Sequence, residues 1–114
     1  MKIGDKSAAD RGVLLVDDDH DVRTFVGQSL EIIGYHVVHA ASARQALAQF
    51  EKHRSEISLV LTDMIMPGDS GDLLALALLI RDPELKVIFM SGNPPDLLGS
   101  RVELVAGRNF LQKP

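Results

Sequence analysis

The sequence predicts an α/β fold in which a parallel sheet is covered by helices on both faces. Residues 13–16, 57–61 and 87–90 are short, continuous apolar runs, which are typical of strands buried on both sides. Segments with helical periodicity lie between these runs, and such alternation predicts parallel strands joined by helical crossovers. The 114 residues are enough for one domain with a single core.

The first half of the chain supplies two strands and two helices after a polar, non-periodic lead-in at residues 1–12. The first strand, residues 13–16, is followed by a helix from His20 to Ile33, and Gly34 stands where a helix end favours glycine. The apolar positions of this helix follow the 3.6-residue period: Val22, Phe25, Val26, Leu30 and Ile33. Residues 35–40 form a weaker candidate strand.

The rest of the alternation follows in order. Ser42 to Gln45 form a capping-box pattern that opens a second helix. The inward-facing positions of that helix are expected to be Ala46, Leu47 and Phe50. A strand at 57–61 and a helix at 71–81, which ends before Pro83, come next. The remaining elements are expected to be a strand at 87–90, a short helix within Pro95 to Val105 and a weak strand at 109–112.

Composition excludes several classes of protein and site. The net charge of −4 argues against direct binding of nucleic acid, which requires a basic surface. The absence of cysteine excludes disulfides and zinc–thiolate sites. The longest apolar run, residues 73–80, is much shorter than the roughly 20 residues that span a membrane. We therefore expect a soluble, cytoplasmic protein with no membrane partner.

Polar residues follow the predicted strands at the points where the strands end. Asp17 and Asp18 follow the first strand, Asp63 the third, Ser91 the fourth and Lys113 the fifth. Because ligands of doubly wound sheets bind beyond the carboxyl ends of the strands, these side chains are expected to form one site.

Three carboxylates in one place would repel one another, and a hard divalent cation, Mg²⁺ or Mn²⁺, would relieve the conflict. Lys113 adds a positive charge and Ser91 a hydroxyl that can donate to an anionic oxygen. A carboxylate nucleophile, a metal, an ammonium and a hydroxyl are together what phosphoryl transfer to an aspartate requires. Taken alone, Asp17 or Asp18 would more often be a helix N-cap, and Ser91 part of a turn. Five such residues at one end of a sheet favour the functional interpretation.

Four segments resemble the motifs of response-regulator receiver domains, the chemotaxis-type family of two-component signalling. Residues 13–19 (VLLVDDD) resemble the first-strand signature, and residues 61–71 (LTDMIMPGDSG) resemble the phosphoacceptor segment. Residues 89–92 (FMSG) resemble the switch-hydroxyl strand, and residues 110–114 (FLQKP) resemble the final Lys-Pro motif. The resemblance covers residues 13–114 and implies a flavodoxin-like, five-stranded parallel sheet with strand order 2-1-3-4-5. We expect the domain to lack the fifth helix that usually follows in this family.

The resemblance also implies roles at the matching positions of the metal site. Asp63 would be the phosphoacceptor and a metal ligand. Asp17 and Asp18 would hold Mg²⁺, with the backbone carbonyl of Ile65 as a further ligand. Ile65 is bulky and apolar, and it is expected to screen an acyl phosphate from water.

Further roles fall on the last two motifs. Ser91 would bond a phosphoryl oxygen and move toward it, and Phe110 would be the switch aromatic that turns inward in response. Phe110 stands where many relatives carry tyrosine, so a contact through a hydroxyl is lost. Lys113 would pair with Asp63 or its phosphate, and the bond from Lys113 to Pro114 is commonly cis in this family.

The expected partner is a sensor histidine kinase or a histidine phosphotransfer domain, and the last two motifs suggest a receiver fused to a hybrid sensor kinase. The protein would not be an enzyme beyond catalysing its own phosphorylation and dephosphorylation.

One alternative is a receiver-like binding module that accepts no phosphate. Another is a Mg²⁺-dependent phosphatase of the haloacid dehalogenase type, which would need an acid where Ile65 stands. The all-round apolar helix at 73–80 also predicts a homodimer.

Overall fold

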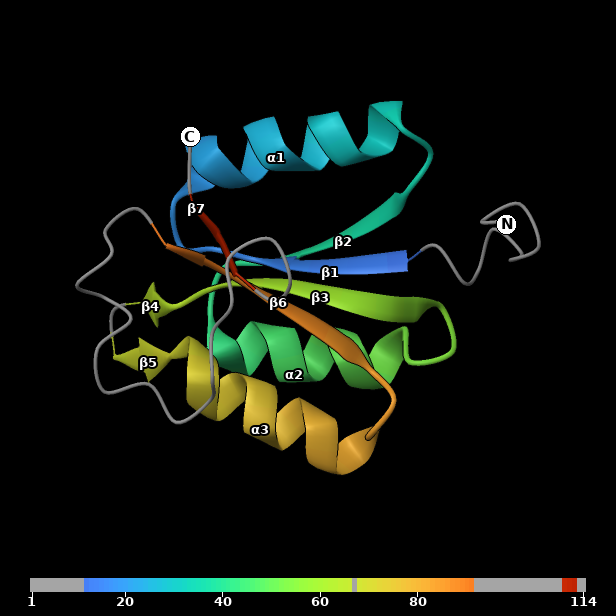
Figure 1. Cartoon of the computed structure of the whole chain (residues 1–114), viewed down its shortest axis with the longest axis vertical. Helices are drawn as coiled ribbons and strands as arrows, with labels where there is room; N and C mark the ends of the chain where they lie inside the picture. The colour runs from blue at the N-terminus through green and yellow to red at the C-terminus, as the bar shows by residue number, and fades with distance from the viewer. Residues whose placement is uncertain (1–11, 67, 92–109, 113–114) are drawn as a thin grey trace.

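Five parallel strands form the central sheet of the molecule (Figure 1). They are β1 (Gly12–Val16), β2 (His36–Ala40), β3 (Ile57–Asp63), β6 (Lys86–Ser91) and β7 (Phe110–Gln112). Their spatial order is β2-β1-β3-β6-β7, and each pairing is parallel. Counted within this sheet, the order is the expected 2-1-3-4-5. The computed structural model describes residues 12–66, 68–91 and 110–112.

Helices cover both faces of the sheet, as the alternation of elements predicts. They are α1 (His20–Ile32), α2 (Ala43–Lys52) and α3 (Gly71–Arg81). Figure 1 shows α1 on one side of the sheet and the pair α2 and α3 on the other. None of these three helices is long and apolar enough to cross a membrane, within the part of the chain that the structure describes.

The alternation of side chains along β1 divides the core into two halves. Leu14 and Val16 belong to the larger cluster, which includes residues of α2 and α3. Val13 and Leu15 point to the opposite face, where they pack with residues of α1. All four side chains are completely buried, so the central strand is apolar on both faces until it reaches Asp17.

The end of α1 confirms the expected glycine cap, but two of the apolar positions that follow the helical period are exposed. Gly34 has a φ of 101°, and the N–H of Tyr35 donates to the carbonyl of Leu30 over 3.0 Å, as in a Schellman motif. Leu30 packs against the core, whereas Phe25 and Ile33 are 60% and 65% exposed. A shared helical period therefore does not place every apolar side chain of this helix in the core. Within the described residues α1 is the only helix on its face, so no neighbouring helix covers its flanks.

The start of α2 confirms the capping-box prediction in a slightly shifted form. The Ser42 hydroxyl accepts from the N–H of Gln45 over 3.1 Å. The Gln45 side chain accepts in return from the N–H of Ala41 over 2.8 Å, one residue before the cap. Ala46 and Phe50 are completely buried, as their spacing in the sequence predicts.

A small antiparallel ribbon, which the sequence does not predict, separates β3 from α3. Its strands are β4 (Ile65–Met66) and β5 (Asp69–Ser70), and Gly68 between them has a φ of 72°. Strands of two residues are too short to show an alternating pattern, which explains why they were missed. The ribbon leads directly into Gly71, the first residue of α3.

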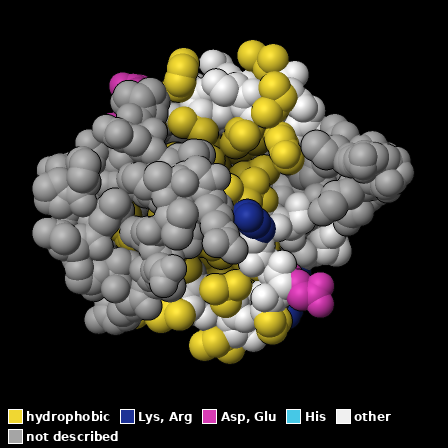
Figure 2. Space-filling model, in the orientation of Figure 1, with side chains coloured by type: hydrophobic (Ala, Val, Ile, Leu, Met, Phe, Trp, Pro, Cys, Tyr) yellow, Lys and Arg dark blue, Asp and Glu magenta, His cyan; other side chains and the backbone are white. Residues whose placement is uncertain are grey.

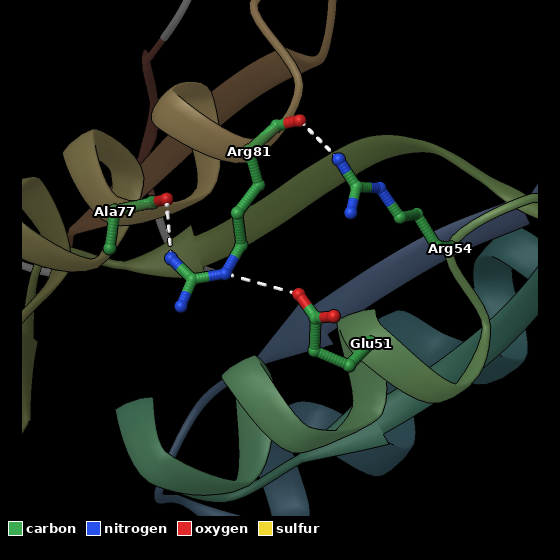
Figure 3. A network of polar contacts seen from close by, with 4 residues as sticks. All are labelled: Glu51, Arg54, Ala77 and Arg81. Atoms are coloured by element: carbon green, nitrogen blue, oxygen red, sulfur yellow. Dashed lines mark hydrogen bonds and ion pairs between the residues drawn. The ribbon is translucent and has the colours of Figure 1, made fainter.

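A polar network joins the C-terminal ends of α2 and α3 (Figure 3). The Arg81 guanidinium lies 3.1 Å from the Glu51 carboxylate and donates to the carbonyl of Ala77 over 2.9 Å. Arg54 donates to the carbonyl of Arg81. Because Glu51 and Arg81 are exposed, we expect this network to orient the helix ends more than to stabilise the fold.

The apolar helix α3 has one buried side and one exposed side. Leu74 and Leu78 are buried against the core. Leu73, Leu76 and Ile80 are exposed, and we call these three residues the α3 stripe. Figure 2 shows hydrophobic side chains at the surface over α3, at the bottom of the view, and over α1 at the top.

Two expectations fall on parts of the chain that the structure does not describe. Residues 1–11 of the predicted lead-in and the short helix within Pro95 to Val105 both lie outside the described residues. Gly12, the last residue of the predicted lead-in, instead begins β1.

Candidate functional site

Three aspartates meet at the carboxyl edge of the two central strands. Asp17 directly follows β1 and Asp63 ends β3, and these strands pair so that Val16 lies opposite Thr62. Asp17, Asp18 and Asp63 each place a carboxylate oxygen within 4.8 Å of the others. Asp17 and Asp63 are buried, whereas Asp18 is exposed and leaves the cluster open to solvent on one side. The predicted convergence of these three residues is confirmed.

Hydrogen bonds to the start of α1 shape the loop that carries the first two acids. The N–H of Asp19 donates to the Asp17 carboxylate over 2.9 Å. The Asp19 side chain caps the helix by accepting from the N–H groups of Asp21 and Val22, over 3.0 and 3.1 Å. Asp19 therefore has the capping role that an isolated Asp17 or Asp18 would most often have.

Asp63 is held in place by its neighbours on two sides. The N–H of the next residue, Met64, donates to the carbonyl of Met90 on β6 over 2.9 Å. The N–H of Gly71 donates to the carbonyl of Met64 over 2.8 Å, which brings the first turn of α3 against the end of β3. A Cβ atom on Gly71 would lie 2.2 Å from the main-chain oxygen of Asp63. The sequence motif contains this glycine, but the close approach to Asp63 was not predicted.

The other predicted site residues are described only in part. Ser91 ends β6, the neighbour of β3, so its main chain lies at the same edge of the sheet as Asp63. Phe110 begins β7, the next strand in the sheet. The side chains of Ser91 and Phe110, and all of Lys113, lie outside the described part of the structure. Ile65 begins β4 and is 54% exposed.

The donor set of the aspartate cluster fits a hard divalent cation. Mg²⁺ binds oxygen ligands at about 2.0–2.1 Å, so two oxygens on one such ion lie about 4 Å apart at most. The carboxylate oxygens lie within 4.8 Å of one another, so small rotations of the side chains bring them to that spacing. All the donor atoms are oxygen, which favours Mg²⁺ or Mn²⁺ over softer metals. Within the described residues, no second group of three or more potential ligand side chains gathers in this way.

A hollow of about 330 Å³ lies between α1 and β2. It is lined by His20, Arg23, Thr24, Gln28, Glu31 and His39. His39 is exposed overall, but a Cβ on Gly27 would lie 2.8 Å from its ring, which therefore rests against α1. This partial burial lowers the pKa of His39 below its ordinary value of 6.5, and the charge of Arg23 acts in the same direction.

Comparison with known proteins assigns the chain to one family. Residues 13–114 match the family model of the response regulator receiver domain. The chain is 34% identical to the response regulator receiver protein CpdR of Brucella abortus over 102 residues, which are 90% of this chain and 83% of CpdR. It is 36% identical to the sensor kinase CckA of the same organism, also over 90% of this chain, but that match spans only 11% of CckA.

Solved structures agree with this assignment. A response regulator receiver domain protein from Clostridium thermocellum superposes with a TM-score of 0.73. That match covers 90% of this chain and 82% of the other at 27% identity. The match to the family model over nearly the whole described fold, with the acidic cluster at its expected edge, leads to one conclusion. The chain belongs to the response regulator receiver domain family of two-component systems.

Proposed function

We propose that residues 13–114 act as one phosphoacceptor receiver domain, in which Asp63 accepts a phosphoryl group in the presence of Mg²⁺. The observation that carries this proposal is the meeting of three carboxylates at the carboxyl edge of β1 and β3. Asp17, Asp18 and Asp63, with the main-chain carbonyl of Ile65, would hold the cation, and Mn²⁺ would serve in its place. A bound cation would supply positive charge to offset the carboxylates and the oxygens of the transferred group.

The chemistry assigned to Asp63 is a nucleophilic displacement. One Asp63 carboxylate oxygen forms a bond to phosphorus while the bond from phosphorus to the donor breaks, and its electron pair leaves with the donor. The packing of Gly71 and the bond from Met64 to Met90 keep the main chain of Asp63 fixed during the transfer. Positioning of this kind supplies much of the rate in phosphoryl transfer.

Three further residues complete the proposed site. The Ser91 hydroxyl would donate to a phosphoryl oxygen, and the Lys113 ammonium would pair with Asp63 or its phosphate. Movement of Ser91 toward the phosphate would make room for Phe110 to turn inward. Phosphorylation would thereby bias the surface around β6 and β7 toward a second conformation.

The proposed donor is the phosphohistidine of a sensor histidine kinase or of a histidine phosphotransfer domain in the cytoplasm. The chain resembles both CpdR, a receiver protein, and the receiver part of the kinase CckA, so either setting is compatible with its sequence. In this role the domain is a signalling module, and its only catalysis is of its own phosphorylation and dephosphorylation.

Incubation with acetyl phosphate and Mg²⁺ tests this function without the native kinase. We expect intact-protein mass spectrometry to show one added phosphoryl group per chain. Chelation of Mg²⁺ should prevent the addition, and Asp63→Asn should abolish it because an amide lacks the nucleophilic oxygen. An adduct of equal yield in Asp63→Asn would rule out Asp63 as the acceptor.

We also propose that this chain forms a homodimer through the α3 stripe. Leu73, Leu76 and Ile80 are 50%, 38% and 81% exposed on one helix, and such exposed apolar faces are typical of contact surfaces. Covering a few hundred Å² of apolar surface contributes several kcal/mol at about 25 cal/mol per Å², before the costs of association.

Light scattering at tens of micromolar protein measures the predicted dimer. Leu76→Glu should shift the mass to that of a monomer, because it places a charge in the contact. Ile32→Glu on α1, which replaces an exposed apolar residue on the opposite layer, should leave the dimer intact. A monomer mass for the unmodified chain would contradict this proposal.

A further inference from the structure

The Arg23 side chain turns back from α1 to the loop that carries the metal-binding acids. Its Nη1 atom donates to the main-chain oxygen of Asp17 over 2.6 Å. Its Nη2 atom lies 3.3 Å from Nδ1 of His20, and its main-chain N–H donates to the carbonyl of Asp19 over 3.0 Å. One residue of α1 therefore contacts the loop through both its side chain and its main chain.

The contact falls on a residue whose surroundings leave it little room to move. Asp17 is completely buried, and its N–H donates to the carbonyl of Ala40 on β2 over 3.1 Å. The guanidinium binds the carbonyl on the other side of the same residue, so the main chain of Asp17 is held from both directions. A third bond, from the N–H of Asp19, orients the Asp17 carboxylate.

We infer that Arg23 is a positioning residue for the cation site: by binding the main-chain oxygen of Asp17 it keeps the Asp17 carboxylate directed toward Asp18 and Asp63. This inference rests on the proposed function. Arginine suits the task because its planar guanidinium is always charged and presents several donors in a fixed geometry. Its bond is to the main-chain oxygen, so it steadies Asp17 without occupying the carboxylate oxygens that would bind metal.

A merely structural role for Arg23 makes a different prediction. If the bond only ties α1 to β1, its loss would lower the stability of the metal-free protein and leave the affinity for metal unchanged. If the bond positions Asp17, its loss weakens metal binding even where the protein remains folded, since partners that orient ligands typically contribute about 10- to 100-fold to metal affinity.

The affinity of the site for metal is measured by titration with Mn²⁺, monitored through the electron paramagnetic resonance signal of the free ion. We expect Arg23→Gln to raise the Kd for Mn²⁺ by about ten-fold or more. Arg23→Lys should fall between Arg23→Gln and the wild type, because an ammonium can donate to Asp17 but cannot also reach His20 in the same planar geometry. The control is Arg44→Gln, which removes the same charge from an exposed position on α2 and should bind Mn²⁺ as the wild type does.

Each outcome decides the inference. Wild-type affinity in a folded Arg23→Gln variant overturns it. If Arg23→Gln does not fold, Arg23→Lys is compared with the wild type instead. Wild-type affinity for Mn²⁺ in Arg23→Lys then overturns the inference, and several-fold weaker binding supports it. A wild-type protein whose Mn²⁺ binding is unchanged by Asp18→Ala would overturn both the inference and the proposed metal site. If only the inference about Arg23 is overturned, the proposed phosphorylation of Asp63 is unaffected.

Discussion

Replacing Gly71 with alanine is expected to destabilise the protein more than any other single methyl group added near the site. The new Cβ would lie 2.2 Å from the main-chain oxygen of Asp63 and 3.0 Å from Cα of Met64. Both atoms belong to the main chain at the end of a central strand, so neither can rotate away as a side chain would. Overpacking costs about 1–3 kcal/mol in ordinary cores, and we expect the upper end of that range, or about 10 °C in Tm.

The same substitution should also damage the site, because α3 can relieve the clash only by pushing the end of β3. Stabilisation by Mg²⁺ should therefore fall together with Tm in Gly71→Ala. Gly68→Asn is the matched control in the same segment. Gly68 has open space around it, and its φ of 72° is one that asparagine tolerates. A Gly71→Ala variant with the same Tm as the parent protein would show that the first turn of α3 does not pack tightly against Asp63.

Replacing Asp18 with alanine is expected to remove most of the stabilisation that Mg²⁺ gives the folded protein. A ligand present at about 100 times its Kd stabilises the native state by about 2.7 kcal/mol, which is roughly 10 °C in Tm. Asp18 supplies one of the three carboxylates and is exposed, so its removal leaves no cavity in the core. Without metal, Asp18→Ala should be at least as stable as the parent, since one of three neighbouring negative charges is gone.

Thermal unfolding with increasing Mg²⁺ measures this effect for both forms. Asp21→Ala is the matched control, because Asp21 is an exposed acid in the first turn of α1 and lies outside the cluster. It should lose a little stability at the helix N-terminus and keep the full response to Mg²⁺. A rise in Tm that is the same in Asp18→Ala and in the parent would place the metal elsewhere.

Much of the fold and the core of the site follow from the sequence because two patterns are local. Continuous apolar runs mark strands buried on both faces, and the residues after those runs must share an edge when the strands are parallel. That reasoning brings Asp17 and Asp18 together with Asp63 although more than 40 residues separate them. The glycine after the first helix and the cap of the second were predictable for the same local reason.

Features that depend on neighbours far along the chain could not be predicted. Phe25 and Ile33 fit the helical period, but only the arrangement of helices shows that nothing described covers them. The approach of Gly71 to Asp63 depends on the ribbon that joins β3 to α3. The bond from Arg23 to Asp17 needs the path of a long side chain, which periodicity does not reveal.

The residue that carries the phosphoryl group is the most direct test of the proposed function. Peptide mapping after brief incubation with acetyl phosphate and Mg²⁺, at a pH that preserves acyl phosphates, would locate it. We predict a single modified peptide that contains Asp63, in the segment from β3 to β4, and lability of the adduct to hydroxylamine, as expected for an acyl phosphate. A stable adduct on a serine or threonine, or modification at Asp17 or Asp18 with Asp63 untouched, would contradict the assignment of Asp63 as the phosphoacceptor.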